Sequence, residues 1–399
     1  MLVQKYKNML EGKSVIRQLS EFATARGQEI GYENVFDYSL GNPSVPVPEA
    51  FTDTMIRLLE TCEPCMLHGY SPSLGITAVR EAVAASLEKR FGIPYKKEHI
   101  FMASGAAGAL AHAFRLVTEP GDEILTFAPF FPEYHPYVEL SGAVLKVVPP
   151  DRESFQINFE KLEEMLTERV MAVLVNTPNN PSGAVYSGET LRRLAELLRK
   201  KSAEYGHTVY LISDEPYREI VFSGVEAPCV SRFYENTIMC YSFSKSLSLP
   251  GERIGYVAVH PECDGAEYMV PMCGQISRGI GHNCPPSLIQ LAVAEALDKT
   301  ADLSVYETNM NLIYEELLRL GFTCVKPGGT FYIMPRALEE DSRTFCTKAL
   351  KYDLVLVPAD TFGAPGYFRM AYCMDTEKVK RSLPALRSFV RQEYGHMDF

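Results

Sequence analysis

A single lysine set among small hydroxyl residues follows an apolar, β-type run. Lys245 comes after Ser242 and Ser244 at the end of residues 237–241, and Arg253 lies eight residues further on. A lysine at the end of a buried strand is desolvated, which lowers its pKa and leaves a neutral amine able to form a Schiff base. Hydroxyls and an arginine suit a phosphate dianion. The segment fits a seat for pyridoxal phosphate, although a lone Ser-x-x-Lys is more often a surface loop.

Two further apolar runs end in polar side chains. Residues 173–175 lead into a turn rich in Asn, Pro and Gly, in which Pro181 restricts the backbone of Asn180. Another run leads to Asp214 and Tyr217. A carboxylate there can hold a pyridine nitrogen protonated, as an electron-accepting ring requires. Taken singly, the first pattern is also that of an ordinary turn, and an isolated Asp is more often a helix N-cap.

A fourth strand end is built from small residues. After the apolar residues 101–103, the chain passes through Gly105, Ala106 and Ala107 into an apolar helical stretch. Free backbone N–H groups at such a helix start form an anion site without a charged side chain. The pattern is common on its own. Four strand ends in succession, each meeting a different requirement of one cofactor, favour pyridoxal 5'-phosphate.

With these motifs the chain resembles the class I/II aminotransferases, fold-type I pyridoxal phosphate enzymes of the aspartate aminotransferase superfamily, from about residue 14 to the C-terminus. The resemblance implies that Lys245 forms the Schiff base with the cofactor and that Asp214 pairs with the ring nitrogen. It implies that Tyr217 and Asn180 bind the phenolic oxygen of the ring. It also implies a phosphate site made by Gly105, Ala106, Ala107, Ser242, Ser244 and Arg253.

The resemblance also assigns residues outside these motifs. Phe131 falls where the family stacks an aromatic ring on the cofactor, and Arg369 matches the arginine that binds the substrate α-carboxylate. Gly41 lies in a segment that resembles the loop that closes over that carboxylate, and the resemblance also implies that Asn180 binds the substrate. Tyr70 matches a tyrosine that reaches the phosphate of a partner subunit. The resemblance therefore implies a homodimer with shared active sites.

One departure from the family pattern concerns the substrate. Ala107 stands where several aspartate-using relatives carry a lysine or a hydroxyl residue. A lysine there can meet a distal carboxylate, whereas an alanine cannot. We therefore expect that aspartate is not the best amino donor, unless another cation such as Arg278 reaches the site.

The activity that the resemblance implies is transfer of an amino group from an L-amino acid to a 2-oxo acid by ping-pong kinetics. A carbon–sulfur β-lyase of the same fold is the alternative, because one fold and one cofactor support several reactions. A ligand-sensing relative fused to a DNA-binding module is a third reading. It fits poorly, because no basic N-terminal domain is visible and Lys245, Asp214 and Arg369 are all present.

The elements that position these residues alternate between strands and helices. The β-type runs cover residues 100–103, 123–127, 144–148, 172–175, 209–212, 238–241 and 254–259. Helical stretches separate most of them, for example residues 187–205 with Gly206 as a stop. We predict an α/β fold with a mainly parallel seven-stranded sheet between helix layers, and a ligand at the carboxyl ends of the strands.

A chain of 399 residues exceeds the size of one hydrophobic core, so two domains are expected. We place the large cofactor-binding domain at residues 46–290. A smaller α+β domain is expected from residues 1–45 and 291–399, with a long helical stretch over residues 288–320.

Composition excludes several classes of protein. A net charge of −11 argues against binding to nucleic acid, which depends on clustered Lys and Arg. The first residues lack the apolar core of a signal peptide and no run is long enough for a membrane span, so we expect a cytoplasmic protein. The 10 cysteines read as reduced thiols, including the spaced pair Cys62 and Cys65. The histidines show no metal-binding spacing, and no metal is implied.

Overall fold

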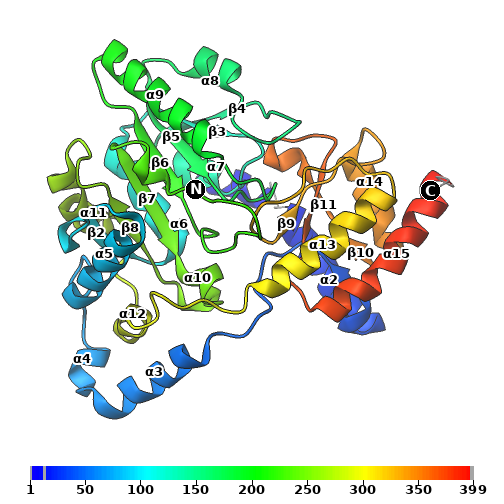
Figure 1. Cartoon of the computed structure of the whole chain (residues 1–399), viewed down its shortest axis with the longest axis horizontal. Coiled ribbons are helices and arrows are strands. Elements are labelled where there is room, and N and C mark those ends of the chain that lie inside the picture. The colour runs from blue at the N-terminus through cyan, green and yellow to red at the C-terminus, as the bar shows by residue number, and fades with distance from the viewer. Residues whose placement is uncertain (1, 12–14, 396–399) are drawn as a thin grey trace.

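The computed structural model describes residues 2–11 and 15–395. Seven strands form one sheet in the order β2-β8-β7-β6-β5-β3-β4 (Figure 1). Strand β8 runs antiparallel to both of its neighbours, and the other neighbouring pairs are parallel. The prediction of a mainly parallel seven-stranded sheet is confirmed. The strands are β2 Ile100–Ala103, β3 Glu123–Phe127, β4 Val144–Val148, β5 Val170–Asn176, β6 Tyr210–Asp214, β7 Thr237–Ser242 and β8 Gly255–Val259.

Both faces of the sheet are covered by helices, which explains why its strands read as continuous apolar runs. Successive residues of β7 show the two faces. Ile238 packs in the core shared with α6 Gly105–Val117, α7 Tyr134–Glu139 and α11 Ala266–Ile280. Met239 packs in the opposite core, with α3 Glu49–Thr61, α5 Thr77–Phe91 and α12 Ser287–Ala294. Over β3, β5 and β6 that second face is covered by α8 Phe159–Met165 and α9 Gly188–Tyr205.

Helix α9 begins and ends where its sequence indicates. The side chain of Ser187 accepts a hydrogen bond from the backbone N–H of Thr190, which caps the first turn. Leu191, Leu194 and Leu198 are buried on one face. Gly206 ends the helix with a φ of 74°, a left-handed conformation that glycine adopts without a steric penalty.

A second core lies beside the sheet, around a three-stranded sheet in the order β11-β12-β9 (Figure 1). Its strands are β9 Tyr332–Ile333, β11 Val357–Pro358 and β12 Phe368–Ala371, and a parallel pair joins β1 Phe36–Asp37 to β10 Leu354–Val355. Helices α2 Val15–Ile30, α13 Ser304–Arg319, α14 Ser342–Ala349 and α15 Thr376–Tyr394 surround these strands. The domain boundaries at residues 46 and 290 stay a proposal.

The single helical stretch expected over residues 288–320 is wrong. Two helices, α12 and α13, occupy this region and residues 295–303 separate them. The backbone N–H of Ala301 donates to the carbonyl of Ser246, which ties the linker to the short helix Phe243–Ser246 that follows β7. The side chain of Asp302 accepts from the backbone N–H of Ser304, the first residue of α13. These contacts satisfy backbone groups that a continuous helix would have used internally.

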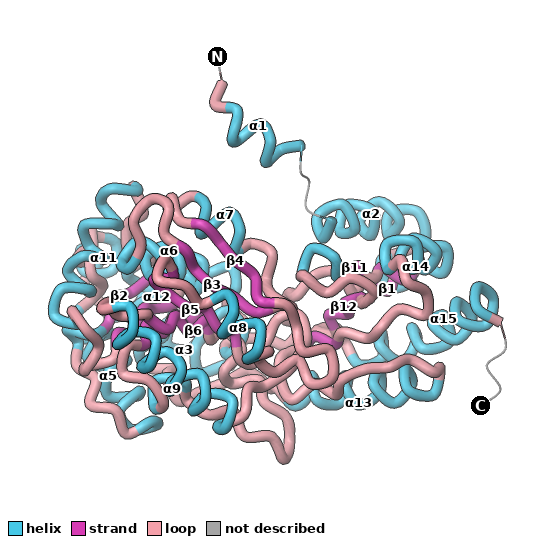
Figure 2. The backbone as a smooth tube through the Cα atoms, turned by 90° about the horizontal axis from the view of Figure 1, so that it is seen from above, coloured by secondary structure: helices cyan, strands magenta, loops and turns pink. Residues whose placement is uncertain are grey.

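The remaining helices are short. Helix α1 Gln4–Glu11 projects from the body of the molecule (Figure 2). Helix α4 Pro64–His68 follows α3 at the edge of the fold, and α10 Phe243–Ser246 follows β7. Within residues 2–11 and 15–395, none of the helices combines the length and the apolar character that a membrane span requires.

Candidate active site

A cavity of about 340 Å³ opens at the carboxyl ends of the central strands, against the second core. Most of the residues singled out in the sequence line it: Gly41, Ala106, Ala107, Phe131, Asn180, Asp214, Tyr217, Ser242, Ser244, Lys245, Arg253 and Arg369. Residues separated by more than 300 positions thus meet in one place. The parallel order of the strands explains part of this, because their carboxyl ends share one edge of the sheet.

Lys245 lies on the short helix α10, directly after β7. Its Nζ donates to the carbonyl oxygen of Gly41 over 2.7 Å and lies 5.4 Å from the centre of the Phe331 ring. The pKa of Lys245 is lowered to about 8, mainly by burial; the nearby Cys373 opposes the shift, and the positive charges of Arg253 and Arg369 contribute to it. A large fraction of the amine is therefore neutral near pH 8, as the sequence analysis anticipated for a nucleophilic lysine.

Asp214, the last residue of β6, is almost fully buried. Its Oδ2 accepts a hydrogen bond from the hydroxyl of Tyr134 over 2.6 Å, whereas its Oδ1 has no partner. Burial raises the pKa of Asp214 to about 7, the hydrogen bond from Tyr134 opposes the rise, and the nearby Glu215 adds to it. A buried acceptor without a donor is costly, so this atom is suited to a ligand that brings an N–H.

Arg369 is buried beneath the cavity on β12. Its guanidinium donates to the side-chain oxygen of Asn180 over 3.2 Å and to the carbonyl of Ser39 over 2.5 Å, and its Nε has no partner. The rings of Tyr332 and Phe362 lie 4.6 and 4.9 Å from it. Among the described residues no carboxylate forms an ion pair with Arg369, so its charge is available to an anionic ligand.

Two phenols lie side by side in the cavity. The hydroxyl of Tyr217 is 3.2 Å from that of Tyr332, and burial raises the pKa of Tyr217 well above its usual value. Asn180 is held in place by its backbone N–H, which donates to the side chain of Asn176 over 2.7 Å. Asn176 in turn donates to the backbone oxygen of Asp214 over 2.9 Å. The ends of β5 and β6 are therefore tied together.

The other end of the cavity offers donors for a phosphate. Ser242 and Ser244 lie with their hydroxyl oxygens 2.7 Å apart, and α6 begins at Gly105 with φ at 75°. A Cβ atom on Gly105 would come within 2.7 Å of the Arg253 guanidinium and would displace it, and the positive φ also favours glycine here. Gly105 does not line the cavity itself, but it lies against Arg253, which does.

Two candidate residues lie elsewhere. Tyr70 is fully exposed and lines a separate concavity with Glu252 and Cys284, outside the cavity that holds Lys245. The idea that Tyr70 completes the site of a partner subunit stays a prediction. Arg278 is exposed on α11 and does not line the cavity either.

Sequence reasoning missed several residues of this site, among them Tyr134, Asn176 and Tyr332. Asn176 is the last residue of β5 and Tyr134 is the first residue of α7, and nothing in the local sequence distinguished them from their neighbours. Tyr332 comes from β9, more than 100 positions from Tyr217, and no local pattern connects the two. Their roles depend on tertiary contacts.

The residues present fit pyridoxal phosphate. The unpaired Oδ1 of Asp214 matches a protonated ring nitrogen, and the depressed pKa of Lys245 matches an amine that reacts with an aldehyde. The Ser242–Ser244 pair and Arg253 match the phosphate.

Comparison with known proteins identifies the family. The sequence model described as aminotransferase class I and II matches residues 33–386. The chain belongs to this family. A crystal structure of an aminotransferase from Eubacterium rectale has 44% identity, with 98% of this chain and 99% of that one covered and a TM-score of 0.95. The aspartate aminotransferase of Thermotoga maritima is 28% identical over 94% of this chain and 99% of its own length, and its crystal structure gives a TM-score of 0.85.

A further relative has a different named substrate. The aromatic-amino-acid aminotransferase 2 of Thermococcus litoralis is 29% identical over 95% of this chain and 96% of its own length. Enzymes of this family depend on pyridoxal phosphate. The protein is an aminotransferase, and none of these three relatives is named as a carbon–sulfur β-lyase.

Proposed function

We propose that the cavity binds pyridoxal 5'-phosphate and transfers an amino group from an L-amino acid to a 2-oxo acid by ping-pong kinetics. One observation carries the proposal. The cavity joins a lysine of lowered pKa, a buried carboxylate oxygen without a donor and a buried arginine without a counter-ion. These are the three groups that amino-acid chemistry on this cofactor requires.

Bound there, the cofactor supplies an aldehyde for the amino group and a ring that accepts electrons from the substrate α-carbon. The protein supplies the rest. Nζ of Lys245, largely neutral above a pH of about 8, would take the proton from the substrate α-carbon and, for amino transfer, would deliver it to the former aldehyde carbon of the cofactor. The Asp214 carboxylate supplies the negative charge that keeps the ring nitrogen protonated, and Tyr134 fixes the orientation of that carboxylate.

Arg369 binds and orients the α-carboxylate of the substrate. Its position is fixed by the Asn180 side chain, by the carbonyl of Ser39 and by stacking on Tyr332. A guanidinium held on two sides in this way presents its remaining N–H groups in one direction, which suits bidentate recognition of a carboxylate.

The lining of the cavity disfavours an acidic side chain on the substrate. Its positively charged members are Lys245, Arg253 and Arg369, and the proposal assigns each of them to the cofactor or to the α-carboxylate. Position 107 is an alanine, so among the described residues that line the cavity no cation is left for a distal carboxylate. We infer that an amino acid with an uncharged side chain is a better donor than aspartate.

A donor panel tests both statements. Purified enzyme is mixed with one amino acid at a time and with 2-oxoglutarate or pyruvate, and the 2-oxo acid formed is measured. Product that depends on the acceptor is expected for alanine, methionine or the aromatic amino acids. Pyruvate and ammonia released from a cysteine conjugate without an acceptor would indicate a β-lyase instead. A kcat/KM for aspartate far above all others would contradict the inference on the side chain.

We also propose a homodimer, supported by the position of Tyr70. Tyr70 is fully exposed and lines a concavity together with Glu252, which precedes Arg253 of the cavity in the sequence. A tyrosine in this position is suited to contact a second subunit. Two-fold symmetry would then supply two equivalent sites.

A further inference from the structure

The helix that carries Lys245 is too short to hold its own position. Helix α10 has 4 residues, and isolated helices of one turn are not stable in water. Besides the contacts of Ser244 with Ser242 and of Lys245 with Gly41, three contacts from outside the helix fix it. The backbone N–H of Phe243 donates to Ile254 over 3.1 Å, and the carbonyl of Ser246 accepts from Ala301 over 2.8 Å. The third contact is made by a side chain, the hydroxyl of Tyr241, which lies 2.9 Å from Oγ of Ser246.

Tyr241 connects this helix to a buried carboxylate. Its hydroxyl is also 3.3 Å from Oε1 of Glu219, so one phenol bridges Ser246 and Glu219. Arg90 donates to both oxygens of Glu219, over 2.9 and 2.7 Å. Burial acts to raise the pKa of Glu219, but Arg218 and Arg90 outweigh it and lower the pKa to about 2. Glu219 is therefore a fixed negative charge at the base of α10.

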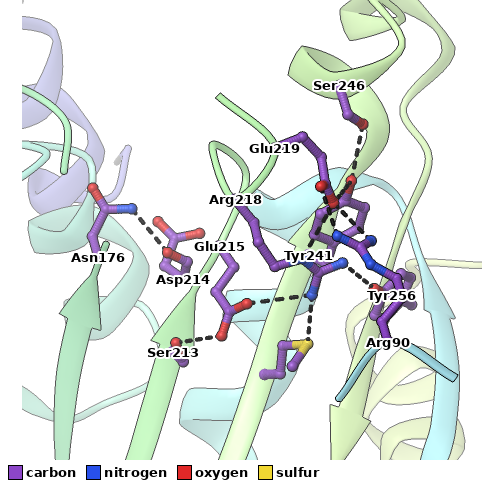
Figure 3. Close-up of polar contacts among 11 residues, drawn as sticks. Arg90, Asn176, Ser213, Asp214, Glu215, Arg218, Glu219, Tyr241, Ser246 and Tyr256 are labelled. Atoms are coloured by element: carbon purple, nitrogen blue, oxygen red, sulfur yellow. Dashed lines mark hydrogen bonds and ion pairs between the residues drawn. The ribbon is translucent and has the colours of Figure 1, made fainter. Parts of the chain in front are cut away.

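Arg218 completes a charge cluster that consists of Arg90, Glu215, Arg218 and Glu219 (Figure 3). Two positive and two negative charges balance within it. The guanidinium of Arg218 lies 4.2 Å from the centre of the Tyr241 ring and contacts Glu215 and Glu219 over 3.3 Å each. Only 9% of the Arg218 side chain and 3% of the Glu215 side chain are exposed. Ion pairs that are excluded from solvent in this way hold a fixed geometry.

The same cluster adjoins Asp214. Glu215 is the next residue in the chain, and Ser213 donates to it over 2.7 Å. Strands β6 and β7 are neighbours in the sheet, with Asp214 opposite Cys240. Figure 3 shows the cluster between these strand ends and Ser246. The cluster therefore contacts the element that carries the carboxylate of the site and, through Tyr241, the helix that carries its lysine.

We propose that Tyr241 is a positioning residue, which holds α10 on the charge cluster and so fixes the Lys245 amine relative to Asp214. The inference rests on the proposed function, because it takes Lys245 as the reacting group. The Tyr241 hydroxyl reaches neither the cavity nor a ligand within it, so its effect passes through Ser246 and the helix.

The chain offers a matched control. The Tyr256 ring stacks on that of Tyr241, with ring centres 5.0 Å apart, and its hydroxyl also touches the cluster, 3.0 Å from Arg218. Tyr256 lies on β8, and no hydrogen bond of its hydroxyl leads to α10. Tyr241→Phe and Tyr256→Phe thus each remove one hydroxyl from the same buried surroundings. Only Tyr241→Phe removes the connection to the lysine helix.

The test uses the cofactor-loaded enzyme. For Tyr241→Phe we expect kcat to fall on the order of tenfold with KM for the amino donor nearly unchanged, since a misplaced group acts on the chemical step. We also expect a shift in the pH midpoint of the visible cofactor absorbance. Tyr256→Phe should change neither quantity, and the two variants should have similar thermal unfolding midpoints. Wild-type kcat and pH midpoint in Tyr241→Phe, or equal losses in both variants, would overturn the proposal.

Ser246→Ala tests the same contact from its other side. It removes the other half of the contact, so it should lower kcat by a similar factor, and the double variant with Tyr241→Phe should lose no more than either single variant. If the losses in kcat of the two single variants added up in the double variant, the proposed action of Tyr241 through Ser246 would be contradicted. The cofactor absorbance of the wild-type enzyme distinguishes a failure of this proposal from a failure of the proposed function. If it gives no amino-acid-dependent change in cofactor absorbance, the proposed function fails; if it does, and Tyr241→Phe behaves identically, only the positioning role fails.

Discussion

The buried carboxylate of Asp214 leads to a prediction about stability and pH. In the protein without cofactor, burial raises its pKa from 3.8 to about 7. A raised pKa means that the folded state binds the proton more tightly than the unfolded chain does. Protonation of Asp214 therefore stabilises the folded state in full below pH 4, and this stabilisation is lost as the pH rises towards 7. One pKa unit corresponds to about 1.4 kcal/mol, so the full loss is about 4 kcal/mol, of which about 3 kcal/mol falls between pH 5 and pH 8.

Asp214→Asn removes the titrating group and keeps an oxygen that can accept from Tyr134. Urea unfolding of the cofactor-free wild type and of this variant should show that the wild type loses stability relative to the variant between pH 5 and pH 8. Added pyridoxal phosphate should abolish the loss in the wild type, because a protonated ring nitrogen supplies the positive partner. A difference between the two proteins that stays constant over this range would refute the reasoning.

Three further results are expected. Arg369→Ala should raise KM for every amino acid by an amount equivalent to about 2 to 5 kcal/mol, and an unchanged KM would mean that another residue binds the carboxylate. Arg218→Met should lower the free energy of unfolding by about 3 to 5 kcal/mol, because it leaves the buried carboxylate of Glu215 without an ion-pair partner. Arg17→Met, which removes an exposed ion pair, should change the free energy of unfolding by about 1 kcal/mol or less. Equal effects of Arg218→Met and Arg17→Met would contradict the burial of the charge cluster. A Tyr70→Phe chain mixed with a Lys245→Ala chain should recover activity in hybrid dimers, and a fully active monomer would exclude shared sites.

The main sheet could be predicted from the sequence because local pattern and global fold agree in it. Strands covered on both faces read as nearly continuous apolar runs, and β2, β5 and β8 show this. Periodicity located helix α9 and its end at Gly206. It failed between α12 and α13, where both flanking segments favour a helix and the break depends on a long-range bond from Ala301 to Ser246.

The proposed active site shows the same division. Asp214 ends β6 and Lys245 follows the end of the neighbouring parallel strand β7, so sequence and topology together place them at one edge. Arg369 was placed by resemblance to a family, since no local pattern connects β12 with that edge. The partners that tune these groups, Tyr134 and Tyr241 among them, are aromatic residues whose hydroxyls find buried acceptors only after folding. Their roles could not be read from spacing.

The identity of the lysine that holds the cofactor tests the account most directly. The cofactor-loaded enzyme is reduced with borohydride, digested, and the labelled peptide is located by mass spectrometry, with Lys245→Ala as the parallel sample. We predict that the label lies on Lys245 and that the variant lacks the borohydride-sensitive visible absorbance. A label on any other lysine, or a variant that keeps this absorbance and native turnover, would contradict the assignment of the active site.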